Sequence, residues 1–109
     1  MNNPEIGALR RRVTLQAPTR IADGGGGAAI TWQPVAQLWA QIRSLSGTEV
    51  VLADSLQGTV THEFTIRKRS DVSPAMRLTM GARIFVIWAV LDRDGLEPFI
   101  RVLAEERLQ

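Results

Sequence analysis

The chain lacks cysteine and tyrosine, and it has a single histidine, His62, and a single lysine, Lys68. Without cysteine there can be no disulfide, no thiolate metal ligand and no cysteine nucleophile. The longest unbroken apolar run, Ile84 to Leu91, is far shorter than the roughly 20 residues that a membrane-spanning helix needs. The first residues also lack the apolar stretch of a signal peptide. These absences predict a soluble, unexported protein without a membrane partner.

Groups that could carry out chemistry are equally scarce. His62 falls in the middle of an alternating segment, on its apolar side, which is typical of a core or boundary histidine with a satisfied hydrogen bond. Asp92 and Asp94 resemble the start of a calcium loop, but Leu103 stands where that loop needs its glutamate. The glycine run after Asp23 lacks the Lys-Ser/Thr ending of a phosphate loop. We therefore expect no catalytic residue, no cofactor and no metal, and a protein that is not an enzyme.

The positive charge comes almost entirely from arginine, since 12 of the 13 basic residues are arginines, although the net charge is only +2. Two basic clusters stand out, at residues 10–12 and 67–69. Solvated strand ends and interface ion pairs are the simpler interpretation, and direct contact with phosphates is the alternative. A set of candidate subunit contacts follows from these clusters and one tryptophan: Arg10, Arg11, Arg12, Trp39, Arg67 and Arg69.

Alternating apolar and polar residues dominate the 109-residue chain, which is long enough for one domain with a single core. Pro18 is expected to end the first strand, and Pro34 to mark a bulge or an edge in the second. The run from Ile84 is apolar on both faces, so we expect it to be the most buried strand. The pattern predicts a mainly β fold, a small antiparallel barrel of six or seven strands. The expected strands are Arg12–Ala17, Ile30–Arg43, Val60–Arg67, Met76–Met80, Ile84–Leu91 and Glu97–Glu105.

One short helix is predicted between two of these strands, at about Thr48–Gln57. Ser46 and Glu49 have the spacing of a capping box, and Gly58 suits the left-handed residue that follows a helix. Leu52 and Leu56, four residues apart, would face the sheet.

Two segments are expected to lie outside the barrel. Residues 1–9 form a flexible N-terminal arm, and residues 19–29 form a glycine-rich loop. Within that loop Asp23, Gly24, Gly25, Gly26 and Gly27 are a candidate for an interface or for the lining of a channel.

The tryptophans differ in their setting. Trp88 is expected in the core because it falls within the doubly apolar run. Trp39 stands among polar residues, which indicates either packing at a barrel end or an anchor for another protein. The pattern gives Trp32 no clear place.

The order of these motifs resembles the phage head–tail joining family. The resemblance runs from Leu9-Arg10-Arg11-Arg12-Val13-Thr14-Leu15-Gln16, through the glycine loop before Thr31-Trp32, to Leu38-Trp39-Ala40-Gln41-Ile42 and Ser46-Gly47-Thr48-Glu49. It continues in Thr61-His62-Glu63-Phe64-Thr65-Ile66-Arg67, Met76-Arg77-Leu78 and Gly81-Ala82-Arg83-Ile84-Phe85-Val86-Ile87. Each motif is weak by itself, whereas their order over nearly the whole chain is fairly specific. The long glycine run and Ile87-Trp88-Ala89-Val90 depart from the usual pattern.

The resemblance implies a head-closure protein, also called a stopper or head–tail connector, of a phage, a prophage or a gene transfer agent. Such proteins form homo-oligomeric rings in the neck of the virion, below the portal and adaptor proteins and above the tail terminator or tail tube. The ring retains packaged double-stranded DNA and docks the tail, and the particle is assembled in the host cytoplasm.

Two other functions compete with this expectation. Small barrels also bind single-stranded nucleic acids through aromatic faces and a basic groove. A different neck or tail-completion protein would share the absence of chemistry. A tight complex with single-stranded DNA would favour the first of these alternatives.

Overall fold

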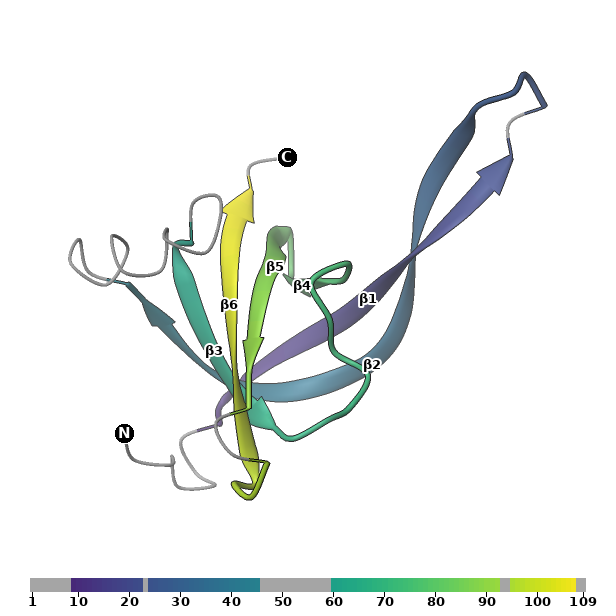
Figure 1. The fold of residues 1–109 in the computed structure, drawn as a ribbon. Coiled ribbons are helices and arrows are strands. Elements are labelled where there is room, and N and C mark those ends of the chain that lie inside the picture. Colours follow the sequence, from purple (N-terminus) through teal and green to yellow (C-terminus); the bar gives the residue numbers. More distant parts are fainter. Residues whose placement is uncertain (1–8, 23, 46–59, 93–94, 108–109) are drawn as a thin grey trace.

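Six antiparallel strands make up the fold in a computed structural model that describes residues 9–22, 24–45, 60–92 and 95–107 (Figure 1). Within these residues the structure contains no helix. Alternating side chains and β-branched residues favour the strands, and turns rich in glycine or proline separate several of them. The strands are β1 (Arg11–Ala22), β2 (Ala28–Ser44), β3 (His62–Arg67), β4 (Arg77–Met80), β5 (Arg83–Leu91) and β6 (Phe99–Arg107).

The strands form one sheet that closes on itself in the order β1-β2-β3-β6-β5-β4. The ring closes where β4 pairs with β1, through Thr14–Thr79, Leu15–Leu78 and Gln16–Arg77. A closed ring leaves few open strand edges, which limits pairing with other chains. The sequence therefore predicted the mainly β, antiparallel architecture correctly.

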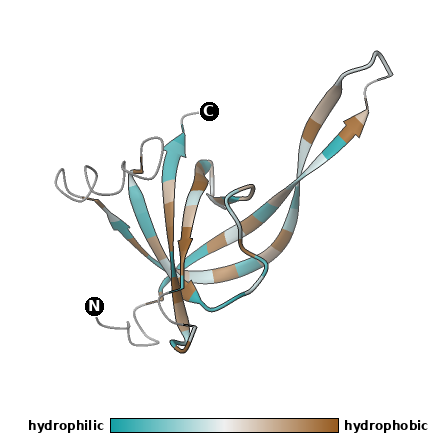
Figure 2. Cartoon of the chain, viewed as in Figure 1, coloured by the Kyte–Doolittle hydropathy of each residue, from teal (hydrophilic) through white to brown (hydrophobic). Residues whose placement is uncertain are grey.

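Side chains that alternate along the strands fill the inside of the ring, and Figure 2 shows this alternation as bands of hydropathy. Phe64 and Phe85 are the largest fully buried side chains, and their rings meet edge to face with centroids 4.8 Å apart. Aromatic pairs prefer this geometry because the positive edge of one ring faces the negative face of the other. Leu15, Ile66, Leu78, Ile87, Ile100 and Val102 surround them.

The outer halves of β1 and β2 leave the ring as a two-stranded ribbon, which we call the projecting ribbon (residues 17–22 and 28–34; Figure 1). Here the two strands pair with each other, whereas β4 meets β1 only up to Gln16 and β3 meets β2 only from Ala40. The molecule measures 50 × 28 × 28 Å.

Pro18 does not end the first strand, contrary to the sequence prediction, because β1 continues to Ala22. Pro18 is opposite Trp32, beyond the point where β4 pairs with β1, so its missing N–H removes no bond to a third strand. The predicted loop of residues 19–29 is accordingly shorter, since the strands leave only residues 23–27 between them. Pro34 does mark a bulge, with Val35 as the extra residue beside it.

The doubly apolar run of β5 is not the most buried strand, and Trp88 is not a core residue. Trp88 is the extra residue of a bulge between Ile87 and Ala89. Its side chain is half-buried, and its indole Nε1 donates a hydrogen bond to Glu105 Oε1 at 3.0 Å. The extra residue of a bulge shifts the alternation of side chains between the two faces of the strand. The residues that face the core before the bulge and those that face it after the bulge therefore belong to different alternating sets. β6 buries more of its residues.

The predicted helix at Thr48–Gln57, the Ser46 cap and residues 1–8 of the predicted arm lie outside the described residues. Leu9, the last residue of that arm, is not loose: it is 8% exposed. The last strand begins at Phe99 and ends at Arg107, two residues later at each end than predicted.

Candidate functional site

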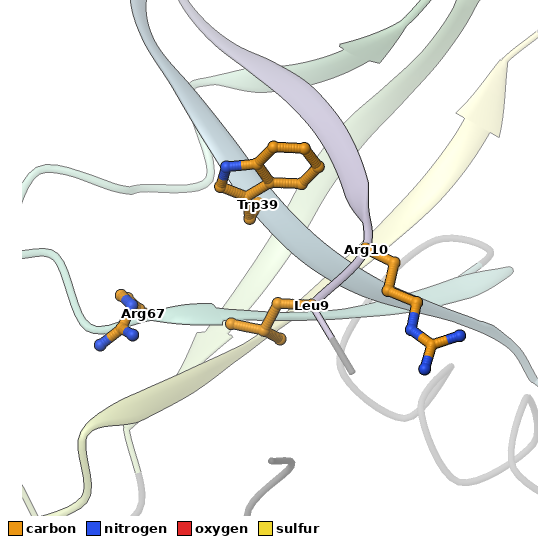
Figure 3. A pocket seen from close by; sticks show the side chains of 4 residues that line it. All are labelled: Leu9, Arg10, Trp39 and Arg67. Atoms are coloured by element: carbon orange, nitrogen blue, oxygen red, sulfur yellow. The ribbon is translucent and has the colours of Figure 1, made fainter. Parts of the chain in front are cut away.

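A recess of about 430 Å³ opens on the outer surface of β2 and is lined by Leu9, Arg10, Trp39 and Arg67 (Figure 3). Leu9 and Trp39 give it an apolar base, although the Trp39 side chain remains 52% exposed. Figure 3 shows Leu9 between the two arginines, with the indole above it. The recess unites three of the six predicted contact residues from three separate parts of the sequence, so we name it the Trp39 recess.

Arg12 extends this site along the outside of the sheet. It is the register partner of Trp39 on β1, and its guanidinium lies 4.9 Å from the indole centroid. Its Nη2 also donates a hydrogen bond to Gln37 Oε1 at 2.9 Å. A guanidinium over an indole face is held by the ring quadrupole while its edge can still donate hydrogen bonds. The stacked pair therefore offers both apolar area and positive charge to a partner.

A second arginine–tryptophan pair lies farther along the same outer face. The Arg77 guanidinium is 4.2 Å from the Trp32 centroid, and its Nε donates to Gln16 Oε1 at 2.7 Å. Partial burial lowers the pKa of Arg77. This pair joins the ring of strands to the base of the projecting ribbon. The sequence pattern gives Trp32 no clear place and does not single out Arg77, because the pairing of β1 with β4 brings these residues together from 45 residues apart.

Two of the six predicted contact residues lie elsewhere. Arg69 is held by Asp71 through a bidentate pair of 2.9 and 2.8 Å, which lowers the pKa of the Asp71 carboxyl. Arg11 lines a separate, mostly polar pocket of about 160 Å³, together with Ser44, His62 and Arg83. The basic cluster at residues 10–12 is thus divided, because alternate residues of a strand point to opposite faces.

His62 is half-buried at one end of the ring of strands, as the sequence predicted for a boundary histidine. Its Nδ1 lies 2.9 Å from Thr61 Oγ1, and its ring meets Phe85 edge to face at 5.2 Å. Burial lowers the pKa of the imidazole, with Glu106 opposing this effect and Arg83 adding to it. The Arg83 guanidinium holds Glu106 in a bidentate pair and lowers the pKa of that carboxyl. The histidine therefore favours its neutral form.

The glycine run forms the end of the projecting ribbon. Gly24 and Gly26 have φ of +83° and +87°, values that side-chain-bearing residues rarely adopt, and no atom lies within 4 Å of a Cβ built on either. Asp23 lies outside the described residues. Ile21 and Ile30, near this end, are 50% and 58% exposed. An element that exposes large apolar side chains is a candidate for contact with another chain.

Neither a cluster of metal-binding side chains nor a membrane-spanning helix occurs among the described residues. No group of three or more histidine, cysteine, aspartate or glutamate residues there could hold a metal ion. No helix in this part of the chain is long and apolar enough to cross a membrane.

The closed ring of strands and the two arginine–tryptophan pairs on its outer face define a small β protein with surfaces suited to contact with other proteins. Residues 4–107 match the family model described as phage head completion protein, and the chain belongs to this family. It is therefore a structural component of the virion head that acts together with other virion proteins.

Two solved structures are similar over nearly the whole chain. One is the solution structure of protein SF1141 from Shigella flexneri 2a, at 25% identity and a TM-score of 0.74, covering 94% of this chain and 96% of the other. The other is a chain of the virion of a native gene transfer agent particle, at 30% identity and a TM-score of 0.63, covering 92% of this chain and 96% of the other. No curated protein sequence matches the chain.

Proposed function

We propose that the protein is a head–tail connector, or stopper. In this proposal, copies of the chain form a ring in the neck of the particle, below the portal and adaptor proteins. The ring retains packaged double-stranded DNA and docks the tail terminator or the tail tube. The family and the similarity to a chain of a gene transfer agent virion support this assignment.

The projecting ribbon is the observation that carries the proposal furthest. A two-stranded hairpin by itself is marginally stable in water, yet this ribbon leaves the ring of strands and exposes Ile21 and Ile30. Burying such side chains against a neighbour would stabilise both the ribbon and the contact. A ribbon that extends beyond its own ring of strands can reach a second subunit or the protein above or below. This is what a connecting protein requires and what an isolated binding domain does not.

The outer arginine–tryptophan face supports the same function. Tryptophan and arginine are enriched among the residues that dominate protein interfaces. Arg12 with Trp39, and Arg77 with Trp32, form two such pairs on one face of the sheet. A subunit of a ring needs two different contact patches, one for each neighbour. The ribbon and the Trp39 recess are two such patches.

Particles assembled without the protein test the proposal. Heads should form and package DNA but then lose it, because no ring closes the portal channel, and they should carry no tails. Nuclease sensitivity of the packaged DNA and negative-stain counts of tailed particles measure the two effects. Complementation with the unaltered chain is the control. Tailed, nuclease-resistant particles at normal yield would overturn the proposal.

Binding of single-stranded nucleic acid is the second candidate function, and the arginine–tryptophan face is the observation that favours it, since bases stack on exposed aromatic rings. One face of each indole, however, is already covered by a guanidinium. A gel-shift titration with single-stranded DNA at several salt concentrations distinguishes the two functions. A tight complex that weakens steeply with salt would favour nucleic-acid binding over the connector.

A further inference from the structure

Three arginines on the outer face of the sheet have no carboxylate partner. Several arginines elsewhere bond to an acidic side chain, as Arg83 does to Glu106. Arg12 and Arg77 bond instead to glutamine side-chain oxygens and stack on tryptophan rings. Arg20 forms no ion pair or hydrogen bond with the residues that the structure describes. Amides and indoles orient a guanidinium without cancelling its charge, so this charge remains for a partner.

These three residues, Arg12, Arg77 and Arg20, form a line that we call the arginine row. Arg12 and Arg20 belong to the same alternating set of β1, and Arg77 is opposite Gln16, midway between them. Each step corresponds to four residues of β1, which is about 13 Å at the rise of an extended strand. The row therefore runs from the ring of strands onto the projecting ribbon and follows its twist (Figure 1).

The strands that carry the row contain no acidic residue. Neither β1, β2 nor β4 includes an aspartate or a glutamate. Burial lowers the pKa of Arg77, and no carboxylate opposes this effect. On β3, β5 and β6, by contrast, basic and acidic side chains are paired. Charge of one sign is therefore concentrated along the row, which favours a partner of the opposite charge.

Exposed apolar side chains lie among these arginines. Trp39 is opposite Arg12 and Ile30 is opposite Arg20, and the two apolar residues are 52% and 58% exposed. The sugar–phosphate backbone of DNA has charge but little apolar surface to cover them, whereas a protein surface supplies both. The combination favours an acidic protein over a nucleic acid.

We infer that the arginine row binds an acidic surface of a different protein of the particle, whose apolar residues cover Trp39 and Ile30. A second copy of the chain lacks the complementary charge. In the described part of the chain, the acidic side chains other than Glu97 are bonded to basic residues of their own copy: Glu63, Asp71, Asp92, Glu105 and Glu106. One remaining carboxylate does not match three arginines.

This inference deepens the proposed function and rests on it for the assembly in which the partner is found, since a connector meets proteins other than itself. It adds the chemistry of the face that meets them. Ile21 belongs to the other face of the ribbon, because it pairs with Ala29, the neighbour of Ile30. That second face is left for contact between subunits.

Photo-cross-linking in assembled particles identifies the partner. p-Benzoylphenylalanine replaces Ile30, and mass spectrometry identifies the adducts formed on irradiation. We expect adducts with another virion protein, at segments rich in aspartate or glutamate. The same replacement at Ile21 is the matched control, since it lies on the same ribbon but on its other face. No adduct, adducts only with a second copy or with DNA, or the same adducts at equal yield from position 21 would overturn the inference.

Two sets of substitutions with the same change in charge test the role of the arginines. The row variant combines Arg12→Gln, Arg20→Gln and Arg77→Gln. The control variant alters arginines that are paired with carboxylates, through Arg43→Gln, Arg69→Gln and Arg107→Gln. The adduct yield from position 30 should fall about tenfold in the row variant and less than about twofold in the control. Equal losses would count against the inference.

Circular dichroism checks that both variants are folded. Arg20→Gln alone keeps the test decisive if the row variant unfolds, because this change removes no polar contact with the described residues. It should lower the adduct yield by about threefold. An unchanged yield would contradict the inference.

Two comparisons separate this inference from the proposed function. If particles without the chain lose DNA and tails while particles with the row variant behave normally, the connector stands and the inference fails. If removing the chain affects neither DNA nor tails, the proposed function fails, and adducts with an acidic protein still support the inference. Binding of a short DNA duplex by the purified protein that is lost in the row variant would assign the row to DNA and overturn the inference.

Discussion

Single residues divide into those that hold the ring of strands together and those that face outward. Phe64 and Phe85 are fully buried and touch edge to face, while Trp39 on the outer surface is half exposed. The same aromatic chemistry therefore serves stability inside and contact outside. Substitution separates the two roles.

Phe64→Ala should lower the free energy of unfolding by about 3–5 kcal/mol, since it removes a buried ring and leaves a cavity. Trp39→Ala, a truncation of comparable size on the surface, should lower it by less than about 1 kcal/mol. Equilibrium unfolding in urea measures both. A smaller loss for Phe64→Ala than for Trp39→Ala would show that the core is not where the structure places it.

His62 should make stability depend on pH in the mildly acidic range. Burial lowers its pKa below the ordinary value of 6.5, so the unfolded chain binds a proton more readily than the folded one. The stability it contributes is present above pH 6.5 and is lost as pH falls toward the lowered pKa. The free energy of unfolding should therefore decrease as the pH falls from about 7 through 6.5 and below.

His62→Gln should flatten that decrease, because glutamine does not titrate. The depressed pKa values of Asp71 and Glu106 act at lower pH, below the ordinary values of 3.8 and 4.5, so the two effects are separable. Urea unfolding of both proteins across this range is the measurement. Parallel pH curves would mean that His62 is not responsible.

The sequence predicted the setting of single residues better than it predicted which distant residues they contact. His62 at a boundary and Trp39 as a possible interface anchor followed from the residues beside them in the sequence. The Arg77–Trp32 pair and the burial of Leu9 did not, because both depend on contacts between distant segments. The division of Arg10, Arg11 and Arg12 between two faces needed the strand register.

At the scale of elements, turns and bulges determine which face of each strand points inward. The β4–β5 hairpin turns at Gly81, whose φ is +61°, and a Cβ built there meets no atom within 4 Å. The glycine is therefore needed for its backbone conformation and not for lack of space. This makes it a clean site for measuring conformational strain.

Gly81→Val should lower the free energy of unfolding by about 1–2 kcal/mol, because a branched side chain disfavours positive φ. Gly81→Asn should cost less, since asparagine tolerates that region. Urea unfolding of the two variants side by side tests the order. Equal losses would indicate a steric contact rather than backbone strain.

Bulges explain the main error in the sequence-based strand assignments. The apolar residues on both sides of Trp88 indicated a doubly buried strand, whereas the inner face changes at the bulge. Side chains of a strand alternate between its two faces with a period of two residues. One inserted residue shifts this alternation, so that in the sequence both faces of the strand read as apolar. The bulge beside Pro34 was predictable because proline marks it, and Trp88 carries no such mark.

At the scale of the whole molecule, the mainly β, antiparallel architecture and the family could be anticipated, and the projecting ribbon could not. Its length depends on where β3 and β4 stop pairing with β2 and β1. Alternation within one strand does not contain that information. The glycine run was recognised as a candidate contact, but it forms the end of the ribbon and not a long loop.

Shortening the ribbon by removing Gly24–Gly27 and joining the strands with Asn-Gly should leave the melting temperature nearly unchanged, because no core residue is removed. The yield of tailed particles should fall if the ribbon contacts a neighbour. Calorimetry and plaque or transfer assays measure the two outcomes. Replacing Gly25 with Ala, at a residue without positive φ, is the control that keeps the length.

The ribbon has a further consequence for how the protein avoids aggregation. Two strands beyond the ring, among those described, present edges that could pair with the edge of any other chain. Pro18 lies on one of these strands, and Pro34 with the Val35 bulge lies on the other. Prolines and bulges on edge strands disfavour pairing with another chain. The prolines therefore disfavour pairing between the ribbon edges of different molecules. Replacing both prolines with threonine should increase self-association of the protein through the exposed strand edges of the ribbon.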